Sequence, residues 1–138
     1  MDHLNHANHN YNACGFLKSE GKYNDWVVTT AFYSCMHYLY VKAFPDSYIV
    51  NNKKSNFSSF HIYYKEYKRF NPTISKHNAT IDIGAEIFPG NIAAAYKALY
   101  DDCHSARYKN YNVLPIIVET SLNSLECIRQ YCSVTVTT

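Results

Sequence analysis

Residues 24–44 read NDWVVTTAFYSCMHYLYVKAF, an apolar stretch that stops before Pro45. Two stripes run through it at helical spacing. Its β-branched opening, WVVTT, also permits a strand, but about 20 residues is long for a strand. Because a helix that is apolar on most sides is usually a central one, we expect a central helix here, capped by Asn24 or Asp25. The stripes are Trp26, Thr30, Tyr33, His37, Tyr40 and Phe44, and Val28, Phe32, Cys35 and Leu39.

Three more apolar stripes, at steps of three and four residues, predict helices on either side of this one. The first helix starts after Asp2, a candidate cap, and ends near Gly21. Another starts at Pro89-Gly90-Asn91, and the last has Pro115 at its first position. The stripes are Leu4, Ala7, Tyr11, Cys14 and Leu17; Ile92, Tyr96, Leu99, Cys103 and Ala106; and Leu114, Val118, Ser121, Leu125, Ile128 and Cys132.

The segments between these helices are more polar. Residues 45–58 look irregular, Phe60–Phe70 looks like a short basic helix, and residues 71–88 are a loop or contain a weak helix. The sequence therefore predicts an all-α fold, an antiparallel up-down bundle of four main helices plus a short extra helix. A length of 138 residues fits a single domain over residues 1–138, and we expect the tail, residues 132–138, to fray.

The composition and the cysteines predict a folded protein in a reducing, cytoplasmic environment. Hydrophobic residues make up 47% and charged residues 17%, so the chain can bury a core. The opening MDHLNHANHN lacks the apolar region of a signal peptide, and Trp26–Phe44 is too polar for a membrane span, so we expect a cytoplasmic location. The five cysteines are odd in number, form no C-x-x-C pair and fall on apolar stripes, which favours buried thiols in a reducing compartment.

Positive charge is concentrated in one segment. The net charge is +2, yet residues 51–80 carry six cations against the single acid Glu66. A local basic patch suits phosphate groups and makes RNA a candidate partner. A solvated helix face beside a loop explains the same charges equally well. The cations are Lys53, Lys54, Lys65, Lys68, Arg69 and Lys76, of which the first five are our candidate RNA-binding residues.

Common enzyme motifs are missing from the sequence: it has no P-loop, G-x-G-x-x-G, G-x-S-x-G, H-E-x-x-H or EF-hand loop. His3 and His6 have a spacing that suits a metal on one side of a helix, but His9 would be rotated away. No cysteine or carboxylate completes the set. We therefore predict neither a metal nor a cofactor.

Two side chains are candidates for chemistry. His37 lies in the middle of the central helix, either as a core histidine bonded to a tyrosine hydroxyl or as a catalytic base. Arg107 lies near a helix end, where the helix dipole alone favours a cation. Its guanidinium is also suited to clamping a phosphate.

Two motifs in this chain resemble those of small prokaryotic HEPN proteins. The first is Asp25-Trp26, Ala31-Phe32-Tyr33 and His37-Tyr38, and the second is Tyr96, Leu99 and Ser105-Ala106-Arg107-Tyr108. The opening helix with His6, Ala7 and Leu17, and the intervening His61, are similar as well. The resemblance spans residues 3–130 and implies a HEPN-like helical domain that forms a homodimer. Many such proteins are metal-independent endoribonucleases of toxin–antitoxin or phage-defence systems, and others are non-catalytic partners of a protein encoded nearby.

The chain departs from the family's usual signature of an arginine, four to six residues and a histidine. After Arg107 the corresponding positions are Asn112, Val113 and Leu114, and Arg69 precedes His77 by seven intervening residues. Lys65 also stands where an arginine often follows the middle histidine. This departure implies either a different ribonuclease site or an interaction module without activity. The sequence leaves open whether Tyr111 or Asn112 replaces the missing histidine.

The corresponding hypothesis for catalysis uses two histidines and one arginine. His37 would activate a 2′-hydroxyl, Arg107 would stabilise the charge on phosphorus, and His61 would act as the acid. Tyr108, Tyr111 or Tyr33 would donate hydrogen bonds. This chemistry needs no metal.

Overall fold

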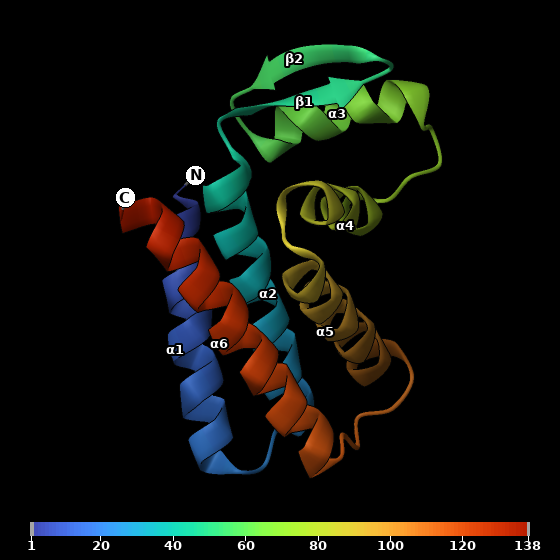
Figure 1. Ribbon diagram of the computed structural model, residues 1–138. Helices are drawn as coiled ribbons and strands as arrows, with labels where there is room; N and C mark the ends of the chain where they lie inside the picture. Colours follow the sequence, from blue (N-terminus) through green and yellow to red (C-terminus); the bar gives the residue numbers. More distant parts are fainter. Residues whose placement is uncertain (1, 138) are drawn as a thin grey trace.

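The computed structural model describes residues 2–137, with side chains as far as Ser133. Over these residues the chain forms six helices and one two-stranded sheet (Figure 1). The predicted helical class is confirmed in its broad form, whereas the expectation of a fold without strands is wrong. The elements are α1 (His3–Glu20), α2 (Asn24–Ala43), β1 (Asp46–Val50), β2 (Lys53–Phe57), α3 (Phe60–Phe70), α4 (Lys76–Ile87), α5 (Gly90–Tyr108) and α6 (Pro115–Thr137).

Helix α2 is central, as predicted, and contacts α1, α5 and α6 (Figure 1). Val28, Phe32 and Leu39 on one of its stripes are buried. The other stripe is more open, with Trp26 49% exposed and His37 half-buried. The predicted cap is wrong: Tyr23 holds the cap position without a side-chain bond. Asn24 donates instead to the carbonyl oxygen of Val113, 3.1 Å away, because the chain before α6 passes beside it.

The remaining stripes mostly face the core. Every member of the α5 stripe is buried, as are the α6 stripe residues from Val118 onward, whereas Leu114 is exposed. Asp2 caps α1 as predicted, accepting from the backbone N–H of Asn5. Cys127 is exposed, which corrects its prediction as a core thiol, since it lies on the outer side of α6. Helix α6 extends to Thr137, and Thr138 lies outside the described residues, so the expected fraying stays a prediction.

Residues 45–58, predicted to be irregular, mostly form an antiparallel hairpin. Asn51 and Asn52 both have positive φ, 50° and 63°, which is the geometry of a two-residue type I′ turn. Asparagine tolerates this left-handed region better than most residues. The strands turn alternate side chains inward, so Tyr48, Val50 and Phe57 are buried while their neighbours face solvent. The hairpin lies over α3 at one end of the molecule (Figure 1).

Helix α4 connects this end to the rest of the fold. It starts at the cap Ser75, buries Ile83 in the core and approaches α2 at Gly84. A Cβ at Gly84 would lie 3.3 Å from the Leu39 side chain, so glycine allows the close approach. In the part of the chain that the structure describes, no helix has both the length and the apolar character needed to cross a bilayer.

Candidate functional site: a histidine pocket

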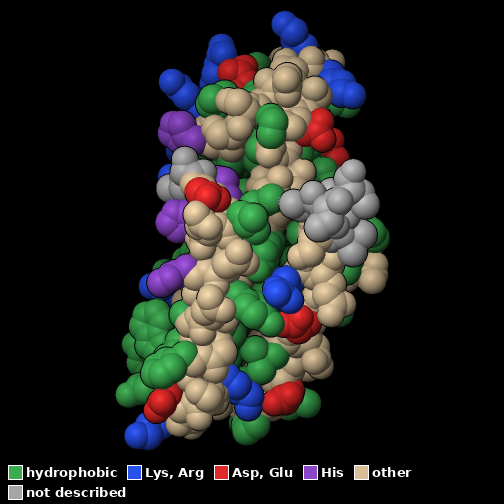
Figure 2. Space-filling view, turned by 90° about the vertical axis from the view of Figure 1, so that its left-hand side faces the viewer, with side chains coloured by type: hydrophobic (Ala, Val, Ile, Leu, Met, Phe, Trp, Pro, Cys, Tyr) green, Lys and Arg blue, Asp and Glu red, His purple; other side chains and the backbone are tan. Residues whose placement is uncertain are grey.

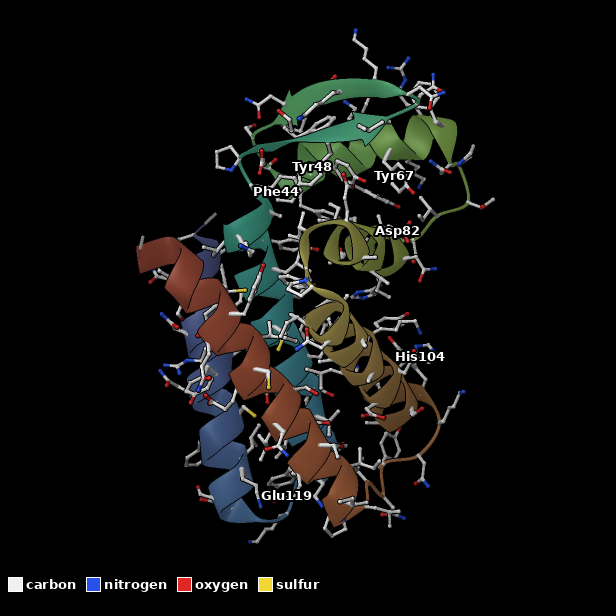
Figure 3. All side chains as sticks on the ribbon, in the orientation of Figure 1. Phe44, Tyr48, Tyr67, Asp82, His104 and Glu119 are labelled. Carbon is white, nitrogen blue, oxygen red and sulfur yellow. The ribbon has the colours of Figure 1, made fainter. Side chains whose placement is uncertain are left out.

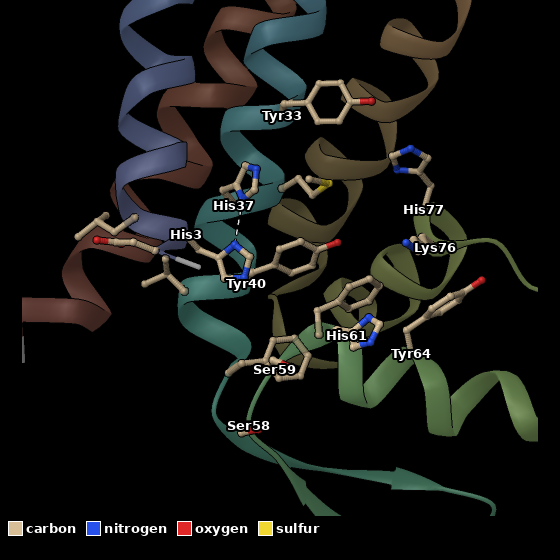
Figure 4. Close-up of a pocket in the computed structure, with 16 residues that line it drawn as sticks. His3, Tyr33, His37, Tyr40, Ser58, Ser59, His61, Tyr64, Lys76 and His77 are labelled. Carbon is tan, nitrogen blue, oxygen red and sulfur yellow. Dashed lines mark hydrogen bonds between the residues drawn. The ribbon is translucent and has the colours of Figure 1, made fainter.

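A pocket of about 890 Å³ opens where the first turns of three helices meet the middle of α2 (Figure 4). Asp2 and His3 come from the start of α1, His61 from the start of α3, and Lys76 and His77 from the start of α4. The start of a helix exposes free backbone N–H groups and the positive end of the helix dipole. Three such ends around one cavity create an environment that favours an anion.

The three helices start at the pocket because short polar residues cap them. The carboxylate of Asp2 and the hydroxyls of Ser59 and Ser75 each accept a bond from a backbone N–H one turn into the helix. None of these helices carries an acidic residue in its first turn. Among the described lining residues, Asp2 holds the only carboxylate, and Lys76 supplies a positive charge.

His37 lies inside the pocket in contact with two histidines of α1. Its Nδ1 is 3.0 Å from Nδ1 of His3 (Figure 4). Its ring stacks on that of His6, with centroids 5.1 Å apart. One Nδ1 of the close pair donates and the other accepts, so the contact cannot hold a proton on both nitrogens. Burial, together with His3 and His6, lowers the pKa of His37 to about 4. Burial also lowers the pKa of His3. His37 is therefore neutral at pH 7 and able to accept a proton.

The opposite wall carries His61, Lys76 and His77 (Figure 4). His61 is exposed at the start of α3, within reach of solvent. Burial, and then the charges of His104 and Arg107, lowers the pKa of His77. The pocket thus holds neutral imidazoles on one side and an accessible imidazole with a lysine on the other.

Aromatic rings form much of the remaining wall. Tyr40 stacks on Phe60 with centroids 4.7 Å apart, and Phe60 stacks on Tyr64 at 5.8 Å. The hydroxyl of Tyr40 is bonded to Thr80 at 2.8 Å, and burial raises its pKa to about 12, so it stays protonated. The pocket therefore combines groups for an anion with flat apolar surfaces for a ring.

A second groove, of about 570 Å³, lies between the hairpin and α3. Some of the predicted basic residues line it and others lie outside it. Lys53, Lys65 and Arg69 line this groove together with Glu66, which pairs with Arg69 at 3.2 Å. Lys54 lies opposite the exposed Ile49 in the register of the two strands, on the outer face of the hairpin. Lys68 lies over the ring of Tyr64, 5.7 Å from its centroid. Figure 2 shows several Lys and Arg side chains at this upper end of the molecule.

Three of the predicted catalytic residues do not line the histidine pocket. Arg107 and Tyr108 lie at the end of α5, where the guanidinium of Arg107 is 5.9 Å from the Trp26 ring. Tyr111 lies in the segment before α6 and is 74% exposed. The structure thus places His37 and His61 in the lining of one pocket, whereas Arg107, Tyr108 and Tyr111 lie outside that lining.

Sequence reasoning missed His3, Lys76 and His77 as members of one site. The available signal was a shared position: each lies in the first turn of its helix, one or two residues after the cap Asp2 or Ser75. Figure 2 shows histidine side chains gathered along one edge of the molecule. Within the described residues, no group of three or more His, Cys, Asp or Glu side chains is placed to hold a metal ion.

The pocket has the kinds of group that acid–base chemistry on a phosphate ester requires. A neutral imidazole accepts a proton, a second imidazole donates one, and a lysine with three helix ends stabilises negative charge. No family model, curated protein or solved structure matches this chain.

Proposed function

We propose that this chain is an RNA-directed, HEPN-like protein that cleaves RNA without a metal ion, with the histidine pocket as its site. The observation that carries the proposal is the meeting of three helix starts, each with an imidazole, around His37 and beside Lys76. The site supplies a base, an acid and positive charge from its own side chains. The up-down bundle and the homodimer that the HEPN resemblance implies belong to the same proposal.

In the proposed reaction the 2′-oxygen of a ribose attacks the adjacent phosphorus. His37 takes the proton of the 2′-hydroxyl as the bond from the 2′-oxygen to phosphorus forms. The bond from phosphorus to the 5′-oxygen breaks, and His61 gives that oxygen a proton. The products are a 2′,3′-cyclic phosphate and a 5′-hydroxyl end. Atoms and protons balance without an oxidant or another reactant.

The low pKa of His37 suits this role once a phosphate is bound. In the empty pocket burial keeps the imidazole neutral, so the base is ready at pH 7. A phosphate anion beside it favours the imidazolium and raises its pKa toward the working range of a general base. Lys76, rather than Arg107, is then the cation nearest the reaction, since Lys76 lines the pocket.

The test is cleavage of labelled mixed RNA in EDTA by the wild type and by three variants, His37→Gln, His61→Gln and Lys76→Ala. We expect loss of about 100-fold or more in rate for each histidine variant, which is the usual contribution of an acid or a base. The products of the wild type should carry 2′,3′-cyclic phosphates. His9→Gln is the matched control, because His9 is an exposed histidine of α1 that does not line the pocket.

Two outcomes would contradict the proposal. One is the absence of cleavage by a folded wild-type protein on every RNA tried. The other is cleavage at equal rates by the wild type and all three pocket variants, which would point to a contaminating nuclease. Thermal unfolding of each variant separates lost chemistry from lost folding. Light scattering measures whether the chain is a dimer.

A second candidate function, a non-catalytic interaction module, is favoured by one specific observation. Exposed apolar side chains gather where α1 ends and α6 begins, two elements joined there by the ion pair of Lys18 and Glu119 at 3.6 Å. Phe16, Leu114 and Ile116 are each more than 60% exposed. Such a surface suits a protein partner. Co-purification of a protein encoded nearby, with no RNA cleavage, would favour this function.

A further inference from the structure

A series of aromatic side chains leads out of the histidine pocket along α5. We call it the ring ladder; its members are Tyr33, His77, Tyr100, His104, Tyr108 and Trp26. Tyr33 and His77 line the pocket, with ring centroids 6.4 Å apart. From His77 the next ring is that of Tyr100, at 5.4 Å. The ladder therefore starts where the proposed chemistry takes place.

Its middle part is set by the geometry of α5. Tyr100, His104 and Tyr108 are four residues apart and share one face of the helix, with centroid separations of 6.1 and 5.0 Å. Four residues of helix rise by about 6 Å. Stacked bases in a duplex strand are about 3.4 Å apart. The rings contact one another, so a base can stack only on the outer side of each ring. A spacing of about 6 Å from ring to ring therefore fits a stretched single strand with one base on each ring, and not a duplex.

Its far end is open to solvent. Tyr108 is 70% exposed and Trp26 is 49% exposed. The guanidinium of Arg107 lies between them, 5.7 Å from the ring of Tyr108 and 5.9 Å from that of Trp26. Burial raises the pKa of Tyr33 in the pocket wall and the positive charge of Arg107 opposes that shift, so the far end of the ladder acts electrostatically on the wall. Exposed rings with a planar cation between them are what proteins use to hold unpaired bases.

The charges along the ladder indicate that stacking, more than ionic attraction, would supply its affinity. Lys97 lies near Tyr100 but is paired with Asp101 at 2.6 Å. Burial, then the nearby Asp101, raises the pKa of Asp102. Arg107 is left as the ladder's main cation toward a phosphate.

We propose that the ring ladder binds single-stranded RNA by base stacking and leads the strand into the histidine pocket. This inference rests on the proposed function, and it assigns Arg107 and Tyr108 to binding and not to the chemical step. Tyr108 is then a positioning residue. Tyr108→Ala should raise KM and leave kcat nearly unchanged, because the ring lies away from the reacting atoms.

Trp26, the chain's single tryptophan, reports binding directly. The probe is a single-stranded RNA oligonucleotide with 2′-O-methyl groups, which lacks the hydroxyl needed for cleavage. We expect saturable quenching of Trp26 fluorescence and weaker binding of the matching duplex. Tyr108→Ala and Arg107→Ala should each weaken binding by about tenfold, the usual size of one base–aromatic contact. Tyr108→Phe should retain binding, and Tyr111→Ala is the control for an exposed tyrosine outside the ladder.

The outcomes separate this inference from the proposed function. Quenching by the single strand, without cleavage of unmodified RNA, would support the ladder and overturn the ribonuclease. Cleavage with an unchanged KM in Tyr108→Ala would overturn the ladder and leave the pocket in place. Equal or tighter binding of the duplex would also overturn it. So would a change of oligomeric mass in Tyr108→Ala with unchanged RNA binding, since that would assign the rings to a protein interface.

Discussion

At the scale of single residues, His37 shows how the position of a histidine on a helix determines its protonation. Its neighbours on α2, Val28, Phe32 and Leu39, are buried in the core, whereas His37 faces the pocket and two other imidazoles. These surroundings favour the neutral form of the imidazole over the protonated form. This preference makes the stability of the folded state depend on pH.

The folded state should become less stable as the pH falls, because the pKa of His37 is lower in the folded chain than in the unfolded chain. The unfolded chain takes up a proton below pH 6.5, whereas the folded chain resists it down to about pH 4. Between these values the unfolded state binds more protons, so the free energy of unfolding falls as the pH falls. The full shift corresponds to about 3 kcal/mol, and solvent in the open pocket reduces the expected loss to about 1 kcal/mol.

His37→Gln should remove most of this loss. Urea unfolding at pH 7, 6, 5 and 4.5 would measure it, with His9→Gln as the control that keeps the wild-type pH dependence. An equal decline in the wild type and His37→Gln would show that the imidazole of His37 is not the cause. His3 and His77, whose pKa values are also lowered, account for what remains.

At the scale of the elements, the hairpin depends on its two-residue turn. Asn52 has φ of 63°, where a β-branched residue is strained by about 1–2 kcal/mol. Asn52→Val should therefore destabilise the fold by about that amount, and Asn52→Gly should be neutral or slightly stabilising. Asn56→Val is the matched control, because Asn56 is exposed on β2 in ordinary strand geometry. Thermal unfolding measures all three, and equal effects of the two valine variants would contradict the turn assignment.

The elements also show what sequence reasoning can predict. The stripe of α5 from Ile92 to Ala106 was predicted residue by residue, because helical periodicity reports directly on the buried face. The hairpin was missed because polar residues outnumber the three buried ones in residues 45–58. The adjacent asparagines between two short alternating runs were the signal. A secondary-structure element is thus predictable from sequence when one whole face is apolar, and less so when only a few of its residues are buried.

The site was predictable only in part, because it is a tertiary arrangement. His37 was chosen for its place on a central helix and His61 for its place in a resemblance. Nothing local indicates that the starts of α1, α3 and α4 meet, since that depends on the approach of α4 to α2 at Gly84 and on the hairpin before α3. Lys76 and His77 became site residues only through that packing.

At the scale of the whole molecule, positive charge and aromatic rings lie in different places. Most of the cations of residues 51–80 surround the hairpin and α3. Lys53 and Lys65 line the groove between these two elements, which we call the basic groove. The far end of the ring ladder, at Trp26 and Tyr108, lies where α2 begins and α5 ends. If one RNA strand contacts both, each region should contribute to affinity in a different way.

Salt dependence separates the two contributions. Each phosphate contact on a single strand contributes about −0.7 to the slope of log K against log salt concentration. Removing Lys53 and Lys65 together should therefore reduce the size of that slope by about 1.4. Tyr108→Ala should lower affinity at every salt concentration and leave the slope unchanged, because stacking releases no counterions. Arg69 is a poorer choice, since its charge is already paired with Glu66.

The control is Lys22→Ala, which removes one charge from the turn after α1, away from the hairpin. Lys18 is a poorer choice, since its charge is paired with Glu119. The effect of Lys22→Ala on the slope is compared with half the effect of removing Lys53 and Lys65. Fluorescence titrations of the 2′-O-methyl strand at four salt concentrations supply all the slopes. If Lys22→Ala reduces the slope as much per charge as the loss of Lys53 and Lys65 does, RNA is attracted by overall charge and the basic groove is not a binding site. If only the groove pair changes the slope, the strand crosses the hairpin end on its way to the histidine pocket.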